Sequence, residues 1–393
     1  MSLVIPADCL QLLQRMVSFN TINRVAEGIL FVEGQLAQYL EQVAQAWGFK
    51  TDRLAVTGDA YNLLVSHEVN SQAPWLLFDS HMDTVGVDGM TVPPFEGLVK
   101  DGKIWGRGSC DTKGTGAAML WALRNAVQSG QLSTNIAILF SIEEEVSKTG
   151  ATVFVEKQLS QLPWYPVGVV VGEPTQLQLI VAHNGYVRWT IRTNGQAAHS
   201  SDPSQGRSAI SAMARVITTI ERDYIPTVTT THPLVGKAQC SINVIRGGSQ
   251  INVIPKSCEV LIDRRLVPEE DATPVLPAVK AVLQPLCESD PQLDVEHLEI
   301  RVDPSLSFDM NRPLADRVGQ VLANLGFPVE PAGVKYGTNA SNLAAGGLPA
   351  VVLGPGDIAQ AHRADEYLEL DQFEQGIKVY QELMSQPASF WGH

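Results

Sequence analysis

Apolar residues along the first 175 positions follow two alternating patterns. In one, apolar residues recur three or four positions apart and stop at Gly48, which predicts an amphipathic helix with a glycine end. The residues of that helix are Leu36, Leu40, Val43 and Trp47. The other pattern is a short unbroken apolar run, which predicts a buried strand and occurs at 75–78, 136–140 and 167–171. Strands separated by helices are typical of an α/β fold whose sheet is covered by helices.

The pattern changes between 180 and 302. It predicts a strand, a helix, two strands, a helix and a strand, in that order. These segments are 186–193, 204–222, 238–244, 259–266, 272–287 and 293–302. Such a βαββαβ order is typical of a compact two-layer, ferredoxin-like unit. From 304 the chain returns to a helix, an apolar strand at 350–353 and a final amphipathic helix, so we expect the small unit to be inserted into the larger one, with 304–313 as a linker.

The charge balance and composition narrow the function classes. The 393 residues include 28 Lys and Arg against 42 Asp and Glu, a formal charge of −14. A field of that sign repels phosphate backbones and anionic lipids, so we expect no nucleic-acid partner and no membrane partner. Five cysteines without a CxxC pair indicate reduced thiols. Because no signal-peptide pattern and no apolar run of about 20 residues occurs, we expect a cytoplasmic protein.

Potential metal ligands follow the predicted strands. His81 and Asp83 are spaced by two, which places both side chains on one face of an extended chain. The pair fits a metal-bound imidazole and its orienting carboxylate, although an ordinary hydrogen-bonded histidine is the simpler interpretation of the pair alone. Asp111 lies in the glycine-rich stretch 106–116, which has neither nucleotide-binding glycine pattern. A helix N-cap and a metal-binding carboxylate both remain open for Asp111.

Three more candidate clusters also follow apolar runs. Glu143, Glu144 and Glu145 are consecutive carboxylates that repel one another unless solvent or cations neutralise them, and a solvated acidic loop is the alternative. Glu173 and His362 follow two further runs. Sites in α/β sheets gather at the carboxyl ends of strands, so the clusters together favour one site. Carboxylates with two imidazoles and no thiolate fit zinc, cobalt or manganese.

Together these motifs resemble the co-catalytic di-zinc peptidase and amidohydrolase family that includes acetylornithine deacetylase, succinyl-diaminopimelate desuccinylase, aminoacylase and carboxypeptidase G. The resemblance runs from HMD at 81 to AHRADE at 361. It implies a zinc-peptidase-like catalytic domain, a mixed sheet flanked by helices, in 1–179 and 304–393. It also implies that the inserted domain, 180–303, serves as a lid and dimerisation domain, which predicts a homodimer.

The resemblance implies two Zn²⁺ ions per chain, or Co²⁺ or Mn²⁺ in their place. It implies that Asp111 bridges the ions, with His81 and Glu173 completing one site and Glu145 and His362 the other. Two ions that share a carboxylate lower the pKa of a bridging water and polarise the scissile carbonyl.

Further roles are implied for residues beside the ligands and in the inserted domain. Glu144 is implied to be the general base, and Asp83 to orient His81. His199, in GQAAHSSDP, is implied to stabilise the oxyanion, often from the opposite subunit of a dimer. Without the resemblance, a surface histidine is the simpler interpretation of His199.

Four residues match family positions that contact or line the substrate site. They are Asn252, Arg265, Gly337 and Thr338. Arg265 suits a substrate carboxylate because its planar fork binds both oxygens, and a surface ion pair with Asp263 or Glu259 is the alternative. Relatives carry Asp or Glu at the position of Asn339, a departure that weakens any transfer of substrate preference.

The resemblance therefore implies a metal-dependent amidohydrolase acting on a small N-acylated amino acid or short peptide. The stretches 172–189 and 351–369 are most similar to acetylornithine deacetylases, which implies release of acetate and ornithine within arginine biosynthesis. A succinyl-diaminopimelate desuccinylase is the nearest alternative, followed by an aminoacylase, a carboxypeptidase or a dipeptidase. A catalytically silent binding module should have lost a ligand or the base, and a mononuclear protease should carry H-E-x-x-H, which this sequence lacks.

Overall fold

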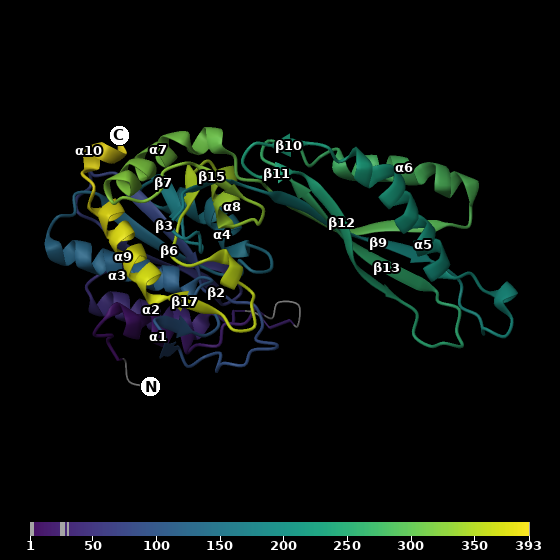
Figure 1. The fold of residues 1–393 in the computed structure, drawn as a ribbon, viewed down its shortest axis with the longest axis horizontal. Coiled ribbons are helices and arrows are strands. Elements are labelled where there is room, and N and C mark those ends of the chain that lie inside the picture. Colours follow the sequence, from purple (N-terminus) through teal and green to yellow (C-terminus); the bar gives the residue numbers. More distant parts are fainter. Residues whose placement is uncertain (1–3, 24–27, 30, 393) are drawn as a thin grey trace. The chain divides into compact units, whose positions relative to one another are not determined.

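The computed structural model describes residues 4–23, 28–29 and 31–392 and divides the chain into two compact units (Figure 1). The first unit comprises 1–181, 308–333 and 338–393, and the second comprises 182–307 and 334–337. No helix among the described residues is long and apolar enough to cross a bilayer.

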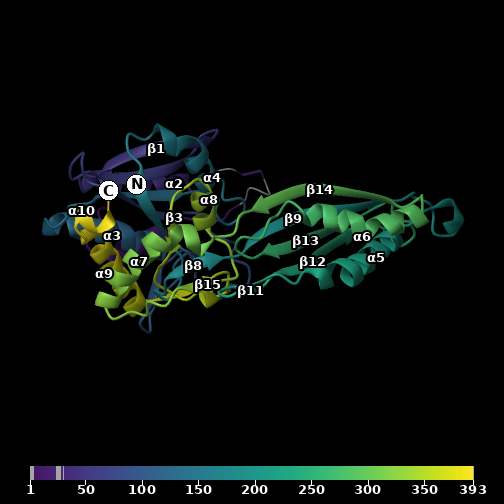
Figure 2. The same ribbon diagram turned by 90° about the horizontal axis from the view of Figure 1, so that it is seen from above.

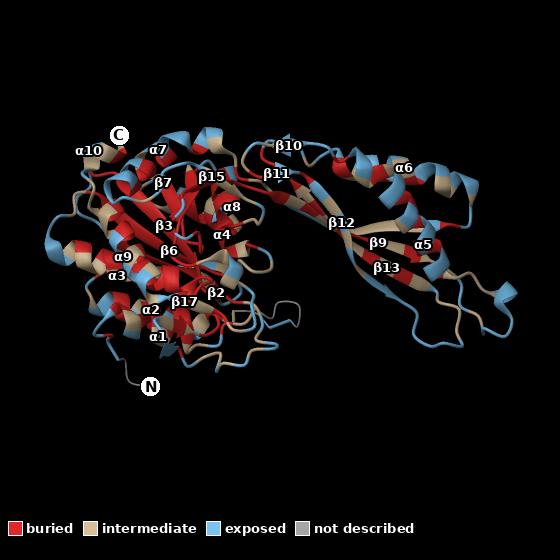
Figure 3. Ribbon diagram, in the orientation of Figure 1, coloured by how far each residue is buried: buried red, intermediate tan, exposed pale blue. Residues whose placement is uncertain are grey.

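The largest sheet has eight strands in the order β1-β2-β6-β3-β7-β16-β8-β15. Their bounds are β1 Lys50–Thr57, β2 Ala60–His67, β3 Trp75–His81, β6 Asn135–Ser141, β7 Pro166–Val171, β8 Ile180–His183, β15 Ala332–Val334 and β16 Ala350–Val352. The central strands β6, β3, β7 and β16 are parallel, while β1, β2 and β8 pair antiparallel. Every residue of β3 and β6 is buried, because helices cover both faces of a parallel sheet (Figure 3).

Helices pack around this sheet. They are α1 Cys9–Val17, α2 Gly34–Ala46, α3 Lys113–Ser129, α4 Thr149–Val153, α7 Phe308–Asn324, α8 Asn339–Ala345, α9 Leu370–Ser385 and α10 Ala388–Trp391. The helix α3 packs against α9 and α1, while α7 and α8 pack against β16. A small sheet of β4 Leu98–Lys100, β5 Lys103–Trp105 and β17 Tyr367–Glu369 completes the unit. This arrangement confirms the predicted α/β class, a mixed sheet flanked by helices.

The second unit is built on one antiparallel sheet in the order β12-β13-β9-β14. Its elements are β9 Gly185–Asn194, α5 Ala209–Thr219, β12 Gln239–Gly247, β13 Ser257–Leu266, α6 Val275–Ser289 and β14 Asp294–Asp303, with a short hairpin of β10 Thr231–His232 and β11 Gly236–Lys237. The helices α5 and α6 lie together on one face of the sheet (Figure 2). Along β13, buried residues alternate with partly exposed ones, so one face packs on the helices and the other faces solvent.

Two sequence-based predictions differ from the structure in their bounds. The helix expected from Ser204 begins at Ala209 with Ser208 as its N-cap, because Arg207 uses its backbone N–H and C=O to pair with Gln196. The boundary between the two units, after Ser307, falls inside the expected linker 304–313, but the linker is shorter than expected because α7 already begins at Phe308. Buried Asn311 on the first turns of α7 accepts a hydrogen bond from the backbone N–H of Ala350, which ties this end of the helix to β16.

Candidate metal centre

The candidate ligands converge because the strands that precede them are parallel. His81 is the last residue of β3, and Glu145 and Glu173 follow its neighbours β6 and β7. His362 follows β16, which runs parallel to β7. Parallel strands end at the same edge of a sheet, so residues far apart in sequence meet there. Asp111 reaches this edge from the turn before α3.

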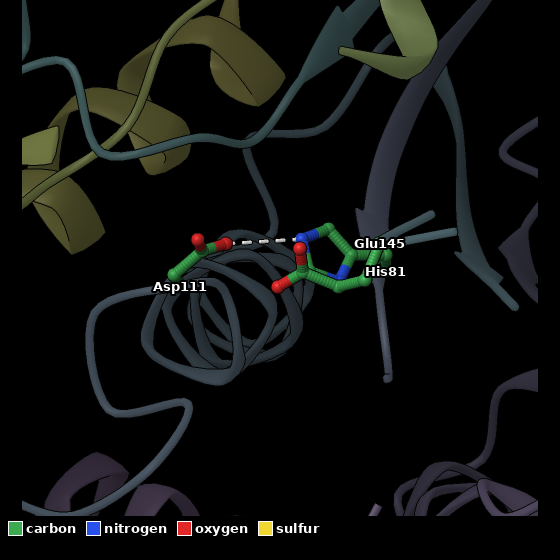
Figure 4. Close-up of side chains that lie close together, drawn as sticks. All are labelled: His81, Asp111 and Glu145. Carbon is green, nitrogen blue, oxygen red and sulfur yellow. Dashed lines mark hydrogen bonds and ion pairs between the residues drawn. The ribbon is translucent and has the colours of Figure 1, made fainter. Parts of the chain in front are cut away.

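Asp111 lies between two pairs of potential ligands. Its Oδ1 lies 3.1 Å from His81 Nε2, which in turn lies 3.9 Å from Glu173 Oε1. Its Oδ2 lies 3.5 Å from His362 Nε2, which lies 3.0 Å from Glu145 Oε2. Ligand atoms of His81, Asp111 and Glu145 all fall within 4.8 Å of one another (Figure 4). The two carboxylate oxygens of Asp111 therefore face different donor pairs.

The buried carboxylates at this edge of the sheet would be stabilised by a bound cation. Burial raises the pKa of Glu144 to about 8 and that of Glu145 to about 7, and it raises the pKa of Glu173 well above its usual value. The Oε1 atom of Glu145 is buried without a hydrogen-bond partner among the described residues. Buried carboxylates with an unused oxygen and two nearby imidazoles match the donor set of a divalent metal site. The residues present therefore fit metal binding.

Both histidines contact carboxylates: His81 contacts Asp111, and His362 contacts Glu145. Burial lowers the pKa of His81, but its hydrogen bonds to Asp111 and Asp83 outweigh that effect and raise the pKa well above the usual value. The hydrogen bond to Glu145 raises the pKa of His362 to about 9. A cation bound here would compete with these ring protons, so its binding would release protons.

Asp83 connects His81, a candidate ligand, to the acidic loop 143–145. Its backbone oxygen lies 3.0 Å from His81 Nδ1, and its Oδ1 lies 3.4 Å from the same ring nitrogen. The carboxylate also accepts hydrogen bonds from the backbone N–H groups of Glu144 and Glu145, at 3.0 and 3.1 Å, and from Asn23 Nδ2 at 2.8 Å. This one buried side chain thus holds the His81 ring and the loop that carries Glu145.

Glu144 lies beside the candidate ligands, with the ammonium group of Lys148 near it. Its Oε1 is 4.0 Å from Lys148 Nζ, which donates to the backbone oxygen of Thr338 at 3.2 Å. The preceding Glu143 has a φ of 59°, and its N–H donates to Glu33 Oε1 at 3.1 Å. Glu33 is buried, and it therefore fixes the turn from which Glu144 and Glu145 project.

Glu366 is a functional neighbour that the sequence did not reveal. This buried carboxylate accepts from the backbone N–H groups of Cys110 and Asp111, at 2.8 and 2.9 Å, and of Gly108 at 3.0 Å. Arg107 Nη1 donates to it at 2.6 Å, and Arg107 Nη2 donates to the backbone oxygen of Arg363 at 2.9 Å. The Arg107–Glu366 pair therefore joins the turn that carries Asp111 to the loop that carries His362. The AHRADE motif contains Glu366, but nothing local distinguishes it from its charged neighbours.

The segment 337–339 shows three different environments. Thr338 is buried, and its hydroxyl oxygen caps α8 by accepting from Ala340 N–H at 3.1 Å. Asn339 is also buried, and its amide donates to Asp79 Oδ2 and Ser141 Oγ, both at 3.0 Å. Gly337 is grouped with the second unit. The departure of Asn339 from its relatives therefore concerns a buried hydrogen-bond network.

In the second unit, His199 and Asn252 lie near each other and are exposed. Ser200 N–H donates to Asn252 O at 3.0 Å, so their segments pair beyond the end of the sheet. His199 Nδ1 lies 2.7 Å from Ser201 Oγ and 3.2 Å from the backbone nitrogen of Ser201; in the tautomer with the ring proton on Nε2, Nδ1 accepts from Ser201 and Nε2 can donate.

Arg265 lies at the other end of the same sheet. It pairs with Asp263 at 3.1 Å, as the ion-pair alternative anticipated, and stands opposite Tyr186 on β9. A strand rises about 3.3 Å per residue, so Arg265 is roughly 26 Å along β13 from Ser257, the end nearer Asn252. Within one chain, a single small molecule therefore cannot contact Arg265 and His199 together.

Comparison with known proteins identifies relatives along the whole chain. The sequence pattern of "Peptidase family M20/M25/M40" matches residues 77–386. An acetylornithine deacetylase of Myxococcus xanthus is 29% identical over 353 residues, covering 86% of this chain and 87% of the relative. A "Probable succinyl-diaminopimelate desuccinylase" of Staphylococcus epidermidis is 27% identical over 420 residues, covering 98% of each chain.

Solved structures share the fold. The M20 family metallo-carboxypeptidase Sso-CP2 of Sulfolobus solfataricus has a TM-score of 0.78 at 18% identity, with 97% of this chain and 99% of that chain covered. The YXEP protein of Bacillus subtilis, described as a dinuclear metal binding peptidase of the M20 family, has a TM-score of 0.69 at 15% identity, with 96% of each chain covered.

Proposed function

The chain belongs to peptidase family M20/M25/M40 and is a hydrolase of amide bonds, and from that premise we propose that it cleaves N-acyl amino acids at a two-metal centre. The products are a carboxylic acid and the free amino acid. The proposed metal ligands are His81, Asp111, Glu145, Glu173 and His362.

One observation carries this proposal. The two oxygens of Asp111 face separate pairs, His81 with Glu173 on one side and His362 with Glu145 on the other. A carboxylate so placed suits a bridge between two cations, each completed by one imidazole and one further carboxylate. Zn²⁺ fits these nitrogen and oxygen donors, and Co²⁺ or Mn²⁺ fits them as well.

The protein's own groups supply the remaining chemistry. Bound divalent cations act as Lewis acids and lower the pKa of water. Glu144 lies next to a ligand, and we assign it to accept a proton from the attacking water and deliver it to the leaving amine. Asp83 holds the His81 ring and the Glu144–Glu145 backbone in place. We assign Nε2–H of His199 as a donor to the developing oxyanion, because Nδ1 is already an acceptor.

The substrate proposal starts from the relatives' names. N-acetylornithine, cleaved to acetate and ornithine, is the first candidate, and N-succinyl-diaminopimelate is the second. The two relatives differ by only two percentage points in identity, so sequence similarity does not rank them. Arg265 is assigned to the substrate's α-carboxylate, with Asn252, Gly337 and Thr338 as further contacts.

We further propose that two copies of the chain form a homodimer. Since His199 and Arg265 lie at opposite ends of one sheet, we assign them to different chains when they act on one substrate molecule. Mixing Glu144→Gln protein with His199→Ala protein, each strongly impaired alone, tests whether His199 acts at the catalytic centre of the other chain. Activity of up to about one quarter of wild type is expected to return through mixed dimers, whereas two variants acting within single chains stay inactive together.

The first experiment is amine release by zinc-replete protein, each assay having a chelator control. The substrates are N-acetylornithine, N-succinyl-diaminopimelate, a panel of small N-acetyl amino acids and dipeptides. Chelator-sensitive turnover of any of these supports the proposed reaction. Fewer than about one tightly bound metal per chain after zinc addition, with no turnover, favours the catalytically silent binding module instead.

A further inference from the structure

Lys148 is a buried lysine in the loop that follows β6. Its side chain is 7% exposed, and it lies four residues after Glu144, the proposed base. Lysine is almost never fully buried unless it is paired, because removing an ammonium group from water is costly. Lys157, a little further along the chain, shows the usual alternative of an exposed side chain. The burial of Lys148 therefore indicates that specific contacts hold its ammonium inside the protein.

The backbone of the loop fixes where the Lys148 side chain begins. Lys148 has a φ of 53°, in the left-handed region that residues other than glycine seldom adopt. Its N–H donates to the backbone oxygen of Glu143 at 2.7 Å, and its own oxygen accepts from Thr152 N–H, in α4, at 3.0 Å. Hydrogen bonds on both sides of the residue hold this unfavourable conformation. The loop thus turns back on itself between Glu143 and Lys148.

The far end of Lys148 is anchored on an atom that does not depend on Glu144. Nζ donates to the backbone oxygen of Thr338 at 3.2 Å, and Ser341 Oγ donates to the same oxygen at 3.2 Å. Thr338 is buried, and its hydroxyl caps α8 by accepting from Ala340 N–H. The start of a helix therefore holds the acceptor in place, and the ammonium is a charge with a fixed position.

The Glu144 side chain is held firmly at its backbone end only. Its backbone N–H donates to Asp83 Oδ1 at 3.0 Å, but its carboxylate lies several rotatable bonds further out. Oε1 of that carboxylate is 4.0 Å from Lys148 Nζ, its one ion pair among the residues that the structure describes. The Glu144 side chain is 10% exposed, so solvent ions screen this attraction little. The ammonium therefore favours the carboxylate orientation that faces it.

We propose that Lys148 is a positioning residue: its ammonium, anchored on the Thr338 carbonyl, holds the Glu144 carboxylate in the orientation from which Glu144 takes the proton of the attacking water and passes it to the leaving amine. This inference rests on the proposed function, in which Glu144 is the base. Lys148 acts through Glu144 and touches neither substrate nor metal. Because a misplacement of about 1 Å at a reacting centre can slow a reaction about a hundredfold, loss of the ammonium should appear in kcat.

Removal of the charge tests the position of the base. Lys148→Met keeps an unbranched side chain without the ammonium, and it should lower kcat by about a hundredfold, with KM changed by less than about threefold and zinc content unchanged. Lys148→Arg, which keeps a cation, should lose less. Lys157→Met is the matched control, because Lys157 is exposed, and its kcat should equal that of wild type. A rise in KM at unchanged kcat, a loss of zinc, or an equal fall in the control overturns the inference.

A double-mutant cycle tests whether Lys148 acts through Glu144. In the Glu144→Gln background the carboxylate that Lys148 orients is gone, so adding Lys148→Met should lower the residual kcat by less than about threefold. A residue that acts on the fold or on the substrate instead lowers kcat by the same factor in both backgrounds. A further fall of about a hundredfold in the double variant therefore overturns the inference.

Crystal structures of the zinc-loaded protein separate this inference from the proposed reaction. If wild-type protein cleaves none of the panel substrates, the proposed function fails for them, and the orientation of Glu144 still tests the role of Lys148. Wild type should show one Glu144 carboxylate position facing Lys148, and Lys148→Met should show a displaced or divided one. The same single position in both proteins overturns the inference. Should Lys148→Met fail to fold, Lys148→Gln, whose neutral amide still donates hydrogen bonds, takes its place in every measurement.

Discussion

The two units hold their charged residues in opposite ways. In the first unit the candidate ligands are mostly buried, and backbone N–H groups fix the carboxylates around them, as at Asp83 and Glu366. In the second unit His199 is exposed and lies in the segment after β9, where its ring contacts its neighbour Ser201. A preorganised buried site suits bond cleavage, while an exposed polar face can distinguish substrates at little cost to the fold.

The largest expected effect removes the proposed base from the buried site. Glu144→Gln should lower kcat by about a thousandfold or more, because the proton acceptor is lost while the amide keeps the shape of the side chain. Metal content measured by atomic emission and the circular dichroism spectrum should stay as in wild type. Activity within tenfold of wild type would show that another group takes the proton.

The next largest effect concerns the Arg107–Glu366 pair, which we call the Glu366 brace. It joins the turn that carries Asp111 to the loop that carries His362. Glu366→Ala should cost about 3–5 kcal/mol of unfolding free energy, because it strands the buried Arg107 and removes the acceptor of three backbone N–H groups. Urea denaturation of the metal-free protein measures this loss without the contribution of bound metal. A loss of less than about 1 kcal/mol of unfolding free energy would mean that other contacts hold the two segments together without the Glu366 brace.

A smaller effect is expected at the exposed histidine of the second unit. His199→Ala should lower kcat about a hundredfold, the usual cost of losing one oxyanion donor, with metal content unchanged. Loss of metal in this variant would instead make His199 a ligand or a structural residue. Ser201→Ala is a milder companion, since the Ser201 N–H that directs the ring proton to Nε2 remains in that variant.

The pH dependence of the metal-free protein should reveal the buried carboxyls. Glu144 and Glu145, with pKa values of about 8 and 7, keep protons in the folded state that the unfolded chain releases near pH 4.5. The folded state then binds more protons, so stability falls as pH rises from about 5 to 8. The raised pKa of His362 acts the same way, because its contribution is lost as pH rises through about 9. The melting temperature of chelated protein should drop from pH 6 to pH 9, and zinc should oppose the drop.

The smallest expected effect concerns an ion pair on the surface of the second unit, in contrast to the buried pairs of the first unit. Asp290→Asn weakens the ion pair with Arg215 in the second unit, where the side chains of Arg215 and Asp290 are 47% and 31% exposed. Exposed ion pairs contribute little, so urea unfolding should show no measurable change in midpoint. A large loss here would erase the distinction between the two units.

The fold class was accessible from sequence because both periodicities are strong. Unbroken apolar runs indicated buried strands, and the order of strands and helices between 186 and 302 indicated a two-layer βαββαβ unit. The start of α5 was missed because Arg207 pairs with Gln196, a contact that no local pattern encodes. Element types follow from neighbouring residues, whereas element ends depend on distant partners.

The same distinction applies to the candidate site: local patterns predicted some of its residues, and others depend on contacts between distant segments. The chemistry of His81, Asp111 and Glu145 stood out because such residues follow buried strands, and the structure brings their ligand atoms together. Their roles stay predictions until metal is measured. Glu33 and Glu366 escaped notice because their importance lies in contacts across the fold: Glu33 reaches Glu143, 110 residues away. A single sequence contains no record of such contacts.

The Glu366 brace also sets an order of events during synthesis. The backbone of Asp111 is held by a carboxylate 255 residues further along the chain. A ribosome completes the strands β3, β6 and β7 and the entire second unit before it reaches that carboxylate. Until then the turn at Asp111 lacks its acceptor, so a nascent chain is poorly prepared to retain metal. Metal loading should therefore follow translation of Glu366, and a chain stalled before that codon should emerge without a working centre.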